Sequence, residues 1–277
     1  TQGMVCHETY KDPDNNWVSP EEIDILDGKK YLKKDKSKLI TVGPSESMSK
    51  SKKNTIDPEN IISNYGADAA RLFILSDSPP EKDVQWSEEG IVSSFKFIQK
   101  LWNLNSIILE EIKKNHQKDS DDEISKFTNK LIKKVTENLE NFSYNKIVAN
   151  LHEMYSFFFK QTDNNYSKDT LFENYHKILV LMSPVIPHFA NECLQILGKN
   201  KSIFWPSYDD SLIEEKEVQI VIQINGKKRG LIKVERNIEE ELLYKQIIND
   251  EKISKFIIKG EIKKKIYVKN RLVNLII

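Results

Sequence analysis

Hydrophobic residues recur at helical spacing through the middle of the chain, from about residue 91 to residue 190. The first of four stripes follows Ser87, which can cap a helix at its N-terminus. The stripes consist of Phe95, Ile98, Trp102, Leu109 and Ile112; Ile124, Phe127, Leu131, Val135 and Leu139; Tyr144, Ile147, Leu151, Tyr155 and Phe158; and Phe172, Tyr175, Ile178, Leu179 and Met182. Polar stretches separate them, and Pro184 and Pro187 interrupt the fourth. The pattern predicts an antiparallel helical bundle whose stripes form its core.

The pattern before the bundle is different. Residues 1–45 have short apolar runs between turn clusters at 12–16 and 26–30, which predicts short strands and loops. Asp57 and Pro58 are an N-cap and a first helical residue, and that helix should end near residue 66. A second helix is expected from about Ala67 to the Ser78-Pro79-Pro80 stop.

The pattern changes again after Trp205-Pro206. Apolar and polar residues alternate in 218–222, and Asn225-Gly226 is the strongest short signal for a hairpin turn. A helix over 238–249 and strands over 262–268 and 272–277 complete a small α+β domain. The fold class is therefore mostly α: a helical bundle with a short β/loop N-terminal part and a small C-terminal α+β domain.

Composition narrows the class of protein. With 39% hydrophobic and 30% charged residues, the 277-residue chain is typical of globular proteins. No apolar run reaches the ~20 residues that span a bilayer, so no membrane association is expected. The chain opens without a signal peptide and without an initiator Met, so we expect a fragment of something longer. Cys6 and Cys193 are far apart and lack metal-ligand spacing, which predicts plain thiols in the reducing cytoplasm and no metal site.

The zero net charge hides an asymmetry. Residues 216–277 contain 15 Lys or Arg and 8 Asp or Glu, a net charge of +7, and residues 1–215 carry −7. A basic terminal domain suggests an anionic partner, with nucleic acid as the leading candidate. A solubilising, lysine-rich surface explains the same numbers equally well.

Residues 48–54 carry the strongest chemical signal. This segment contains three lysines, two serines and an asparagine, after a Gly43-Pro44 turn. Cationic side chains and hydroxyl donors suit a polyphosphate on which charge develops during reaction. Taken alone, such a run is more often a solvated surface loop or a linker.

Its context resembles a known family. Residues 48–54, then Asp57-Pro58 and Tyr65-Gly66-Ala67-Asp68, resemble the second signature of class I aminoacyl-tRNA synthetases. The further matches are Gln2-Gly3-Met4-Val5, Pro79-Pro80-Glu81, Trp86-Ser87, Ser183-Pro184-Val185-Ile186-Pro187-His188-Phe189 and Val221-Ile222-Gln223-Ile224-Asn225-Gly226-Lys227. Together they look like the C-terminal portion of a bacterial leucyl-tRNA synthetase.

The resemblance implies a domain order and an activity. It divides the chain into the end of a catalytic nucleotide-binding domain (1–56), a connecting stem-contact region (57–90), an anticodon-binding-type bundle (91–207) and a basic tRNA-binding domain (216–277). The family is an aminoacyl-tRNA ligase that activates leucine with ATP, with Mg²⁺ expected, and transfers it to leucine tRNA. The implied partners are leucine tRNA, ATP and the remainder of the synthetase, in a monomer.

It also implies the site residues. Lys50 matches the second signature lysine and is the expected catalytic residue. Ser47 stands where the family usually has Lys, so Lys52 or Lys53 must replace that contact or it is missing. ATP binding falls to Met48, Ser49, Lys50, Ser51, Met4 and Val5. Contacts to tRNA fall to Lys227, Lys228, Arg229, Lys263 and Lys265.

Four other residues have plainer interpretations. Asp68 and Arg71 are either a surface pair three residues apart on one helix or, as we favour, a structural feature of the connecting region. We expect His188 to be a capping or buried histidine, and Trp86 and Trp205 to anchor the ends of elements.

The family's first signature, a His-Ile-Gly-His-like sequence, is absent. The chain is then either a C-terminal piece of the ligase, inactive alone, or a stand-alone, non-catalytic tRNA-binding module.

Overall fold

The computed structural model describes residues 3–114, 122–161, 167–198, 204–213, 217–257 and 262–277. Gln2 of the first motif and residue 216, the predicted start of the terminal domain, lie outside them. The chain forms two compact units, Thr1–Asp209 and Asp210–Ile277, which are described separately. The predicted domains 1–56, 57–90 and 91–207 all fall within the first unit.

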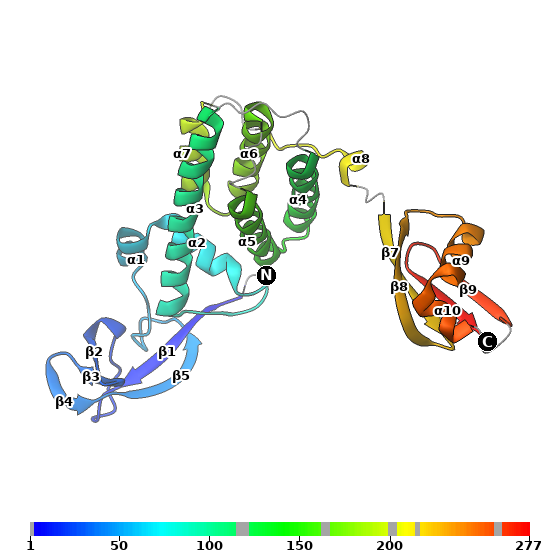
Figure 1. Ribbon diagram of the computed structural model, residues 1–277. Helices are drawn as coiled ribbons and strands as arrows, with labels where there is room; N and C mark the ends of the chain where they lie inside the picture. Colours follow the sequence, from blue (N-terminus) through cyan, green and yellow to red (C-terminus); the bar gives the residue numbers. More distant parts are fainter. Residues whose placement is uncertain (1–2, 115–121, 162–166, 199–203, 214–216, 258–261) are drawn as a thin grey trace. The chain divides into compact units, whose positions relative to one another are not determined.

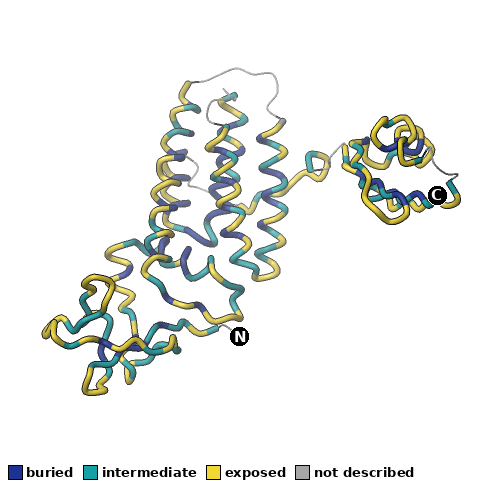
Figure 2. The backbone as a smooth tube through the Cα atoms, turned by 60° about the horizontal axis from the view of Figure 1, so that its bottom comes forward, coloured by how far each residue is buried: buried dark blue, intermediate teal, exposed yellow. Residues whose placement is uncertain are grey.

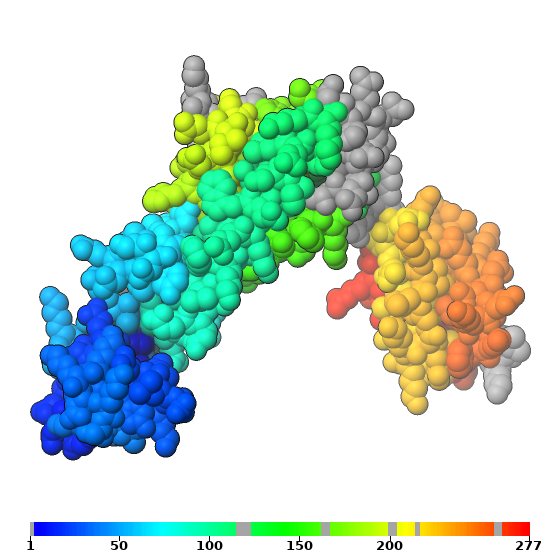
Figure 3. All heavy atoms as spheres, turned by 60° about the vertical axis from the view of Figure 1, so that its left-hand side comes forward, coloured from blue at the N-terminus to red at the C-terminus, as the bar shows by residue number. Residues whose placement is uncertain are grey.

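Short strands form the start of the first unit. Strand β1 (Val5–Lys11) is the centre of a three-stranded sheet, antiparallel to β5 (Thr41–Ser47) and parallel to β6 (Val84–Gln85). Between β1 and β5, the turn Pro20–Glu22 leads into an antiparallel meander of β2 (Ile23–Leu26), β3 (Lys29–Leu32) and β4 (Asp35–Leu39). Figure 3 shows these residues gathered at one end of the unit, next to the first helices.

Two helices connect the strands to the bundle. Helix α1 (Pro58–Tyr65) begins after Asp57, whose carboxylate accepts a hydrogen bond from the backbone N–H of Glu59 at 3.0 Å. Gly66 separates it from α2 (Ala67–Ser76) with a φ of 83°, a value that glycine adopts readily. Both helices lie where Asp57-Pro58 at the start and Ser78-Pro79-Pro80 at the end predicted them.

The bundle contains the predicted hydrophobic stripes. It consists of α3 (Glu88–Lys114), α4 (Asp122–Glu140), α5 (Tyr144–Gln161), α6 (Lys168–Met182) and α7 (Pro187–Ile196). Ser87 caps α3, because its Oγ accepts a hydrogen bond from the Gly90 N–H at 3.0 Å. The buried faces of these helices point toward one another (Figure 2), and Tyr175 in this core donates to Asn105 Oδ1 at 2.9 Å. None of the described helices is long and apolar enough to cross a membrane.

Two aromatic side chains differ from the stripe and motif predictions. Trp102 is 36% exposed, so it lies at the edge of the core, where its ring packs edge-to-face on Phe189. The His188 side chain is exposed, so the expectation of a buried histidine was wrong. His188 takes part in capping only through its backbone N–H, because it is the second residue of α7.

The second unit is a four-stranded sheet with helices on one face. Its strand order is β8-β7-β10-β9, with β7 (Glu217–Ile224) parallel to β10 (Leu272–Ile276) and antiparallel to β8 (Lys227–Glu235), and β9 (Lys264–Val268) antiparallel to β10. Helix α8 (Asp210–Ile213) precedes the sheet, and α9 (Glu240–Asn249) and α10 (Glu251–Ile257) pack on it. Asn225 and Gly226 both have positive φ, as the predicted hairpin turn requires.

Candidate functional site

The lysine-rich loop, residues 48–54, leaves the end of β5 and lies beside β1. The backbone N–H of Met48 donates to the carbonyl oxygen of Val5 at 3.1 Å, so the structure brings these two predicted ATP-binding residues together. Met4 immediately precedes Val5 in the chain. Its N–H donates to Asp83 Oδ1 at 2.8 Å, and its side chain is 56% exposed.

A buried asparagine, which the sequence did not single out, closes the loop. The Asn54 side chain is fully buried, and its Oδ1 accepts a hydrogen bond from the Ser49 N–H at 2.8 Å. Its Nδ2 donates to the carbonyl oxygens of His7 and Glu46, both at 3.2 Å. One side chain thus joins the start of the loop to two strands. Asparagine's preference for turns was the only sequence signal for this role.

The side chain of His7 contacts the backbone of Asn54. Its Nδ1 lies 3.3 Å from the carbonyl oxygen of Asn54, and only 8% of the residue is exposed. Burial lowers the pKa of His7. The neutral ring therefore carries its proton on Nδ1, because a carbonyl oxygen can only accept.

The tip of the loop is a turn with its cations at the surface. The Lys53 N–H donates to the Lys50 carbonyl oxygen at 3.3 Å, and Lys53 has a φ of 54°. The Lys50 side chain is exposed, whereas the Lys52 ammonium forms an ion pair with Glu46. Of the two lysines that could replace the cation missing at Ser47, Lys52 is therefore already neutralised.

The two serines of the loop face each other. Their Oγ atoms, of Ser49 and Ser51, are 3.3 Å apart, and the Lys52 N–H donates to the Ser49 Oγ at 3.4 Å. Because the Ser49 N–H is held by Asn54, only its hydroxyl is available to a phosphate oxygen. The loop therefore offers the exposed Lys50 ammonium and serine hydroxyls to an anion.

A small hydrophobic cluster supports the base of the loop. Met48 packs against a cluster that includes Ile61 of α1, Phe73 of α2 and Trp86 after β6. Trp86 is 8% exposed and meets Phe73 edge-to-face with ring centroids 5.1 Å apart, which confirms its prediction as an anchor. Trp205 is also anchored, because its Nε1 donates to Thr136 Oγ1 at 2.8 Å.

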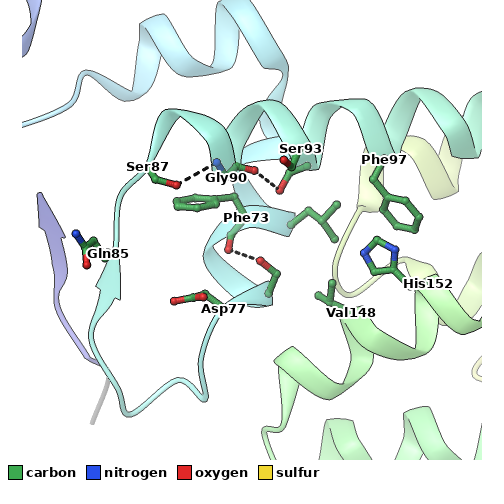
Figure 4. A pocket seen from close by; sticks show the side chains of 12 residues that line it. Phe73, Asp77, Gln85, Ser87, Gly90, Ser93, Phe97, Val148 and His152 are labelled. Atoms are coloured by element: carbon green, nitrogen blue, oxygen red, sulfur yellow. Dashed lines mark hydrogen bonds between the residues drawn. The ribbon is translucent and has the colours of Figure 1, made fainter. Parts of the chain in front are cut away.

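The pocket in Figure 4 lies apart from this loop. It has a volume of about 500 Å³ and is bounded by α2, α3 and α5. His152 stacks on Phe97 at one side of it, with ring centroids 3.8 Å apart, and burial followed by the nearby Lys100 charge lowers the pKa of His152. None of the predicted site residues lines this pocket.

The predicted tRNA-binding residues of the second unit lie at the same end of its sheet. Lys227 pairs with Ile224 in β7, Ile224 pairs with Leu275 in β10, and Leu275 pairs with Lys265 in β9. Neighbouring strands lie ~4.8 Å apart, so these two lysines are separated by about 14 Å across the sheet. The sequence placed the two basic groups in a hairpin and a strand, and the strand order brings them into one row.

Aromatic rings hold two of these cations. The Arg229 guanidinium lies 4.4 Å from the centroid of the Phe256 ring, and the Lys265 ammonium lies 4.3 Å from that of Tyr244. Lys228 is exposed beside Lys227. Lys263, also exposed, donates its backbone N–H to the Ile276 carbonyl oxygen at 2.8 Å. The sheet end is therefore cationic over several exposed side chains.

Comparison with known proteins finds two family models that match parts of the chain. Residues 36–87 match the family described as tRNA synthetases class I (I, L, M and V), and residues 121–244 match the anticodon-binding domain of tRNA ligase. Two stretches of the chain are therefore similar to parts of class I aminoacyl-tRNA synthetases.

The relatives narrow the class. The chain is 38% identical to a leucine–tRNA ligase of Bartonella tribocorum, 40% identical to that of Orientia tsutsugamushi and 39% identical to that of Zymomonas mobilis. Each match covers 100% of this chain and 33%, 33% and 32% of the relative, respectively. The chain is homologous to bacterial leucyl-tRNA synthetases, fits their C-terminal portion, and spans about a third of their length.

A solved structure shares the fold. The LeuRS of Agrobacterium radiobacter K84, crystallised as a ternary complex with tRNA and LeuAMS, superposes with a TM-score of 0.72. The match covers 83% of this chain and 31% of that chain at 22% sequence identity, so it supports the architecture alone. The resemblance predicted from the sequence motifs is confirmed by these comparisons.

Proposed function

We propose that the chain is the C-terminal part of a leucine–tRNA ligase, which activates leucine with ATP and transfers it to leucine tRNA. This portion supplies the ATP-phosphate loop and the tRNA-binding domains. The observation that carries the proposal is the match of the whole chain, at 38% identity or more, to enzymes of this name. The remainder of the synthetase supplies the amino-acid pocket and the other half of the ATP site.

Lys50 is the proposed catalytic residue. In amino-acid activation, the leucine carboxylate attacks the α-phosphorus of ATP, and the bond to the leaving pyrophosphate breaks. Negative charge then grows on the bridging and leaving oxygens, and an ammonium held near them stabilises that charge. Lys50 is exposed at the tip of an anchored turn, which supports this role.

The proposed ATP contacts surround Lys50. Met48 and Val5 form the base of the loop, Met4 extends it, and Ser49 and Ser51 offer hydroxyls. Mg²⁺ would arrive with ATP as part of the substrate, and the described residues contain no cluster of His, Cys, Asp and Glu that could hold a metal ion.

The cationic sheet end is the proposed tRNA contact of the second unit. Lys227, Lys228, Arg229, Lys263 and Lys265 would meet phosphates of the tRNA backbone. Contacts of this kind set affinity and position and carry no sequence information themselves. The row across the sheet supports the proposal, because it aligns cations from two separate segments.

The decisive experiment compares two proteins. A protein extended upstream through the reading frame should catalyse leucine-dependent exchange of pyrophosphate into ATP, whereas the isolated chain should bind leucine tRNA in a gel shift without exchange. Absence of exchange in the extended protein, with tRNA binding retained, would replace the ligase with the stand-alone tRNA-binding module. Absence of both would refute each function.

A further inference from the structure

Two charged side chains on α2 reach the turn between α6 and α7. Asp68 and Arg71 are one helical turn apart and so point to the same side of α2. The Asp68 carboxylate accepts hydrogen bonds from the N–H groups of His188, at 3.2 Å, and Phe189, at 2.6 Å. Asp68 is only 7% exposed, so these bonds are shielded from water.

Arg71 binds the other half of the same turn. Its Nε donates to the carbonyl oxygen of Val185 at 3.0 Å, and its Nη2 donates to that of Pro184 at 2.7 Å. The rigid fork of a guanidinium fits two acceptors held at a fixed spacing. The bonds of both side chains therefore confirm the structural role, in preference to a surface pair between Asp68 and Arg71. We call these two side chains and the turn of residues 183–189 the clasp.

The chemistry of the turn explains why this pairing is favourable. Helix α7 begins at Pro187, and its N-cap residue Ile186 provides no side-chain cap. The first N–H groups of a helix need an acceptor, and a carboxylate there also complements the positive end of the helix dipole. Asp68 provides both from 120 residues away in the chain, while Arg71 satisfies carbonyl groups just before α7.

The opposite side of α2 touches the lysine loop's support. Ala69 and Phe73 belong to the hydrophobic cluster against which Met48 packs. Helix α2 is thus in contact with the base of the loop on one side and with the bundle on the other (Figure 1). The first unit has a continuous path of packed groups from Met48 through α2 and the clasp to α7.

We propose that Asp68 and Arg71 are positioning residues for aminoacyl transfer. They hold the bundle in a fixed position relative to the lysine loop, so that a tRNA bound along the bundle presents its acceptor end at the activated leucine. The inference rests on the proposed function. Placement errors of about 1 Å can cost ~10²-fold in rate, so a loosened clasp should slow transfer strongly.

The test uses the full-length synthetase and two reactions. Pyrophosphate exchange needs the loop but no tRNA, whereas aminoacylation needs both. Asp68→Ala and Arg71→Ala should lower kcat/KM for tRNA charging at least tenfold and change exchange less than threefold. Asp68→Asn and Arg71→Lys, which keep one acceptor or one donor, should restore part of the charging rate.

The control is Asp77→Asn at the C-terminal end of the same helix, where the exposed carboxylate makes no bond to the turn. It should leave both reactions within twofold of wild type. A double variant, Asp68→Ala with Arg71→Ala, should charge tRNA little more slowly than either single variant, because both residues hold one turn.

Two outcomes would overturn the inference. If exchange and charging fall by the same factor in both conservative variants, the clasp only stabilises the fold; if neither falls in the alanine variants, it positions nothing. Failure of the proposed function is distinguishable, because the wild-type protein itself would then neither exchange pyrophosphate nor charge leucine tRNA.

Discussion

Asn54 should be the residue on which the shape of the lysine loop depends most. Replacing it with alanine removes three hydrogen bonds at once: one accepted from Ser49 and two donated to the carbonyl groups of His7 and Glu46. Because the Asn54 side chain is fully buried, water does not replace these partners without opening the loop. Asn54→Ala therefore tests whether the loop is held in place or only rests on the strands.

The structure sets the size of the expected effect. A typical intramolecular hydrogen bond contributes ~0.5–1.5 kcal/mol net, and a buried donor left without a partner costs ~1–3 kcal/mol. The three bonds together predict a loss of about 2–4 kcal/mol in the free energy of unfolding. Asn54→Asp should cost at least as much, because it loses both donated bonds and buries a carboxylate between two carbonyl oxygens.

Tryptophan fluorescence during urea unfolding gives a local measurement. All four tryptophans, Trp17, Trp86, Trp102 and Trp205, lie in the first unit, so the signal reports no unfolding of the second. Trp86 also lies in the cluster that packs on Met48. The same variants in the full-length synthetase should show pyrophosphate exchange reduced at least tenfold, with a raised KM for ATP.

The matched control is Asn60→Ala on α1. Asn60 is exposed and makes one hydrogen bond, to Glu21 Oε1 at 3.3 Å, so its loss should cost less than ~0.5 kcal/mol. If Asn54→Ala unfolds within that same margin of wild type and keeps its exchange rate, Asn54 does not anchor the loop and our account of the site is wrong.

The remaining tests concern Lys50, the second unit and His7. Lys50→Ala in the full-length enzyme should lower pyrophosphate exchange more than tenfold, whereas Ser47→Lys should raise it. If Lys50→Ala lowers exchange less than Lys53→Ala does, Lys50 is not the catalytic residue. Deleting residues 210–277 should weaken leucine tRNA binding and flatten its dependence on salt in filter binding, and an unchanged affinity would contradict the proposed phosphate contacts. Burial lowers the pKa of His7, so the folded protein favours the neutral ring more than the unfolded chain does. The free energy of unfolding should therefore be highest above the unfolded pKa of ~6.5, and it should decrease as the pH falls from there through the lower pKa of the folded protein. Urea midpoints between pH 7 and 5 should fall more for wild type than for His7→Gln, and parallel curves would refute this.

The local features of the fold were predictable because their causes are local. Ser87 and Asp57 cap helices within three residues of themselves, and Asn225-Gly226 forms a turn through its own backbone preference. The helical stripes needed only the 3.6-residue period, although Trp102 shows that a member of a stripe can lie at the edge of the core. Helix α10 was missed because it has only 7 residues, too few for a periodic pattern.

The groups that hold the site together were not predictable in the same way. Asn54 bonds to His7 from 47 residues away, and Asp68 bonds to Phe189 from 121 residues away. Nothing in the local sequence of either residue names its partner. The row from Lys227 to Lys265 likewise depends on the parallel pairing of β7 with β10, which no hairpin signal reveals.

The geometry of the loop indicates which lysine can replace the signature lysine that is absent at position 47. Glu46 neutralises Lys52, which leaves Lys53 as the remaining candidate for the cation absent at position 47. Lys53 holds a left-handed backbone conformation, which costs a residue other than glycine about 1 kcal/mol. The next residue, Asn54, makes three hydrogen bonds through its buried side chain, which are enough to offset that cost and hold the turn. In the proposed function, a turn held this way keeps the backbone of Lys50 and Lys53 in place before ATP binds, and a preorganised charge stabilises a transition state more than a mobile one.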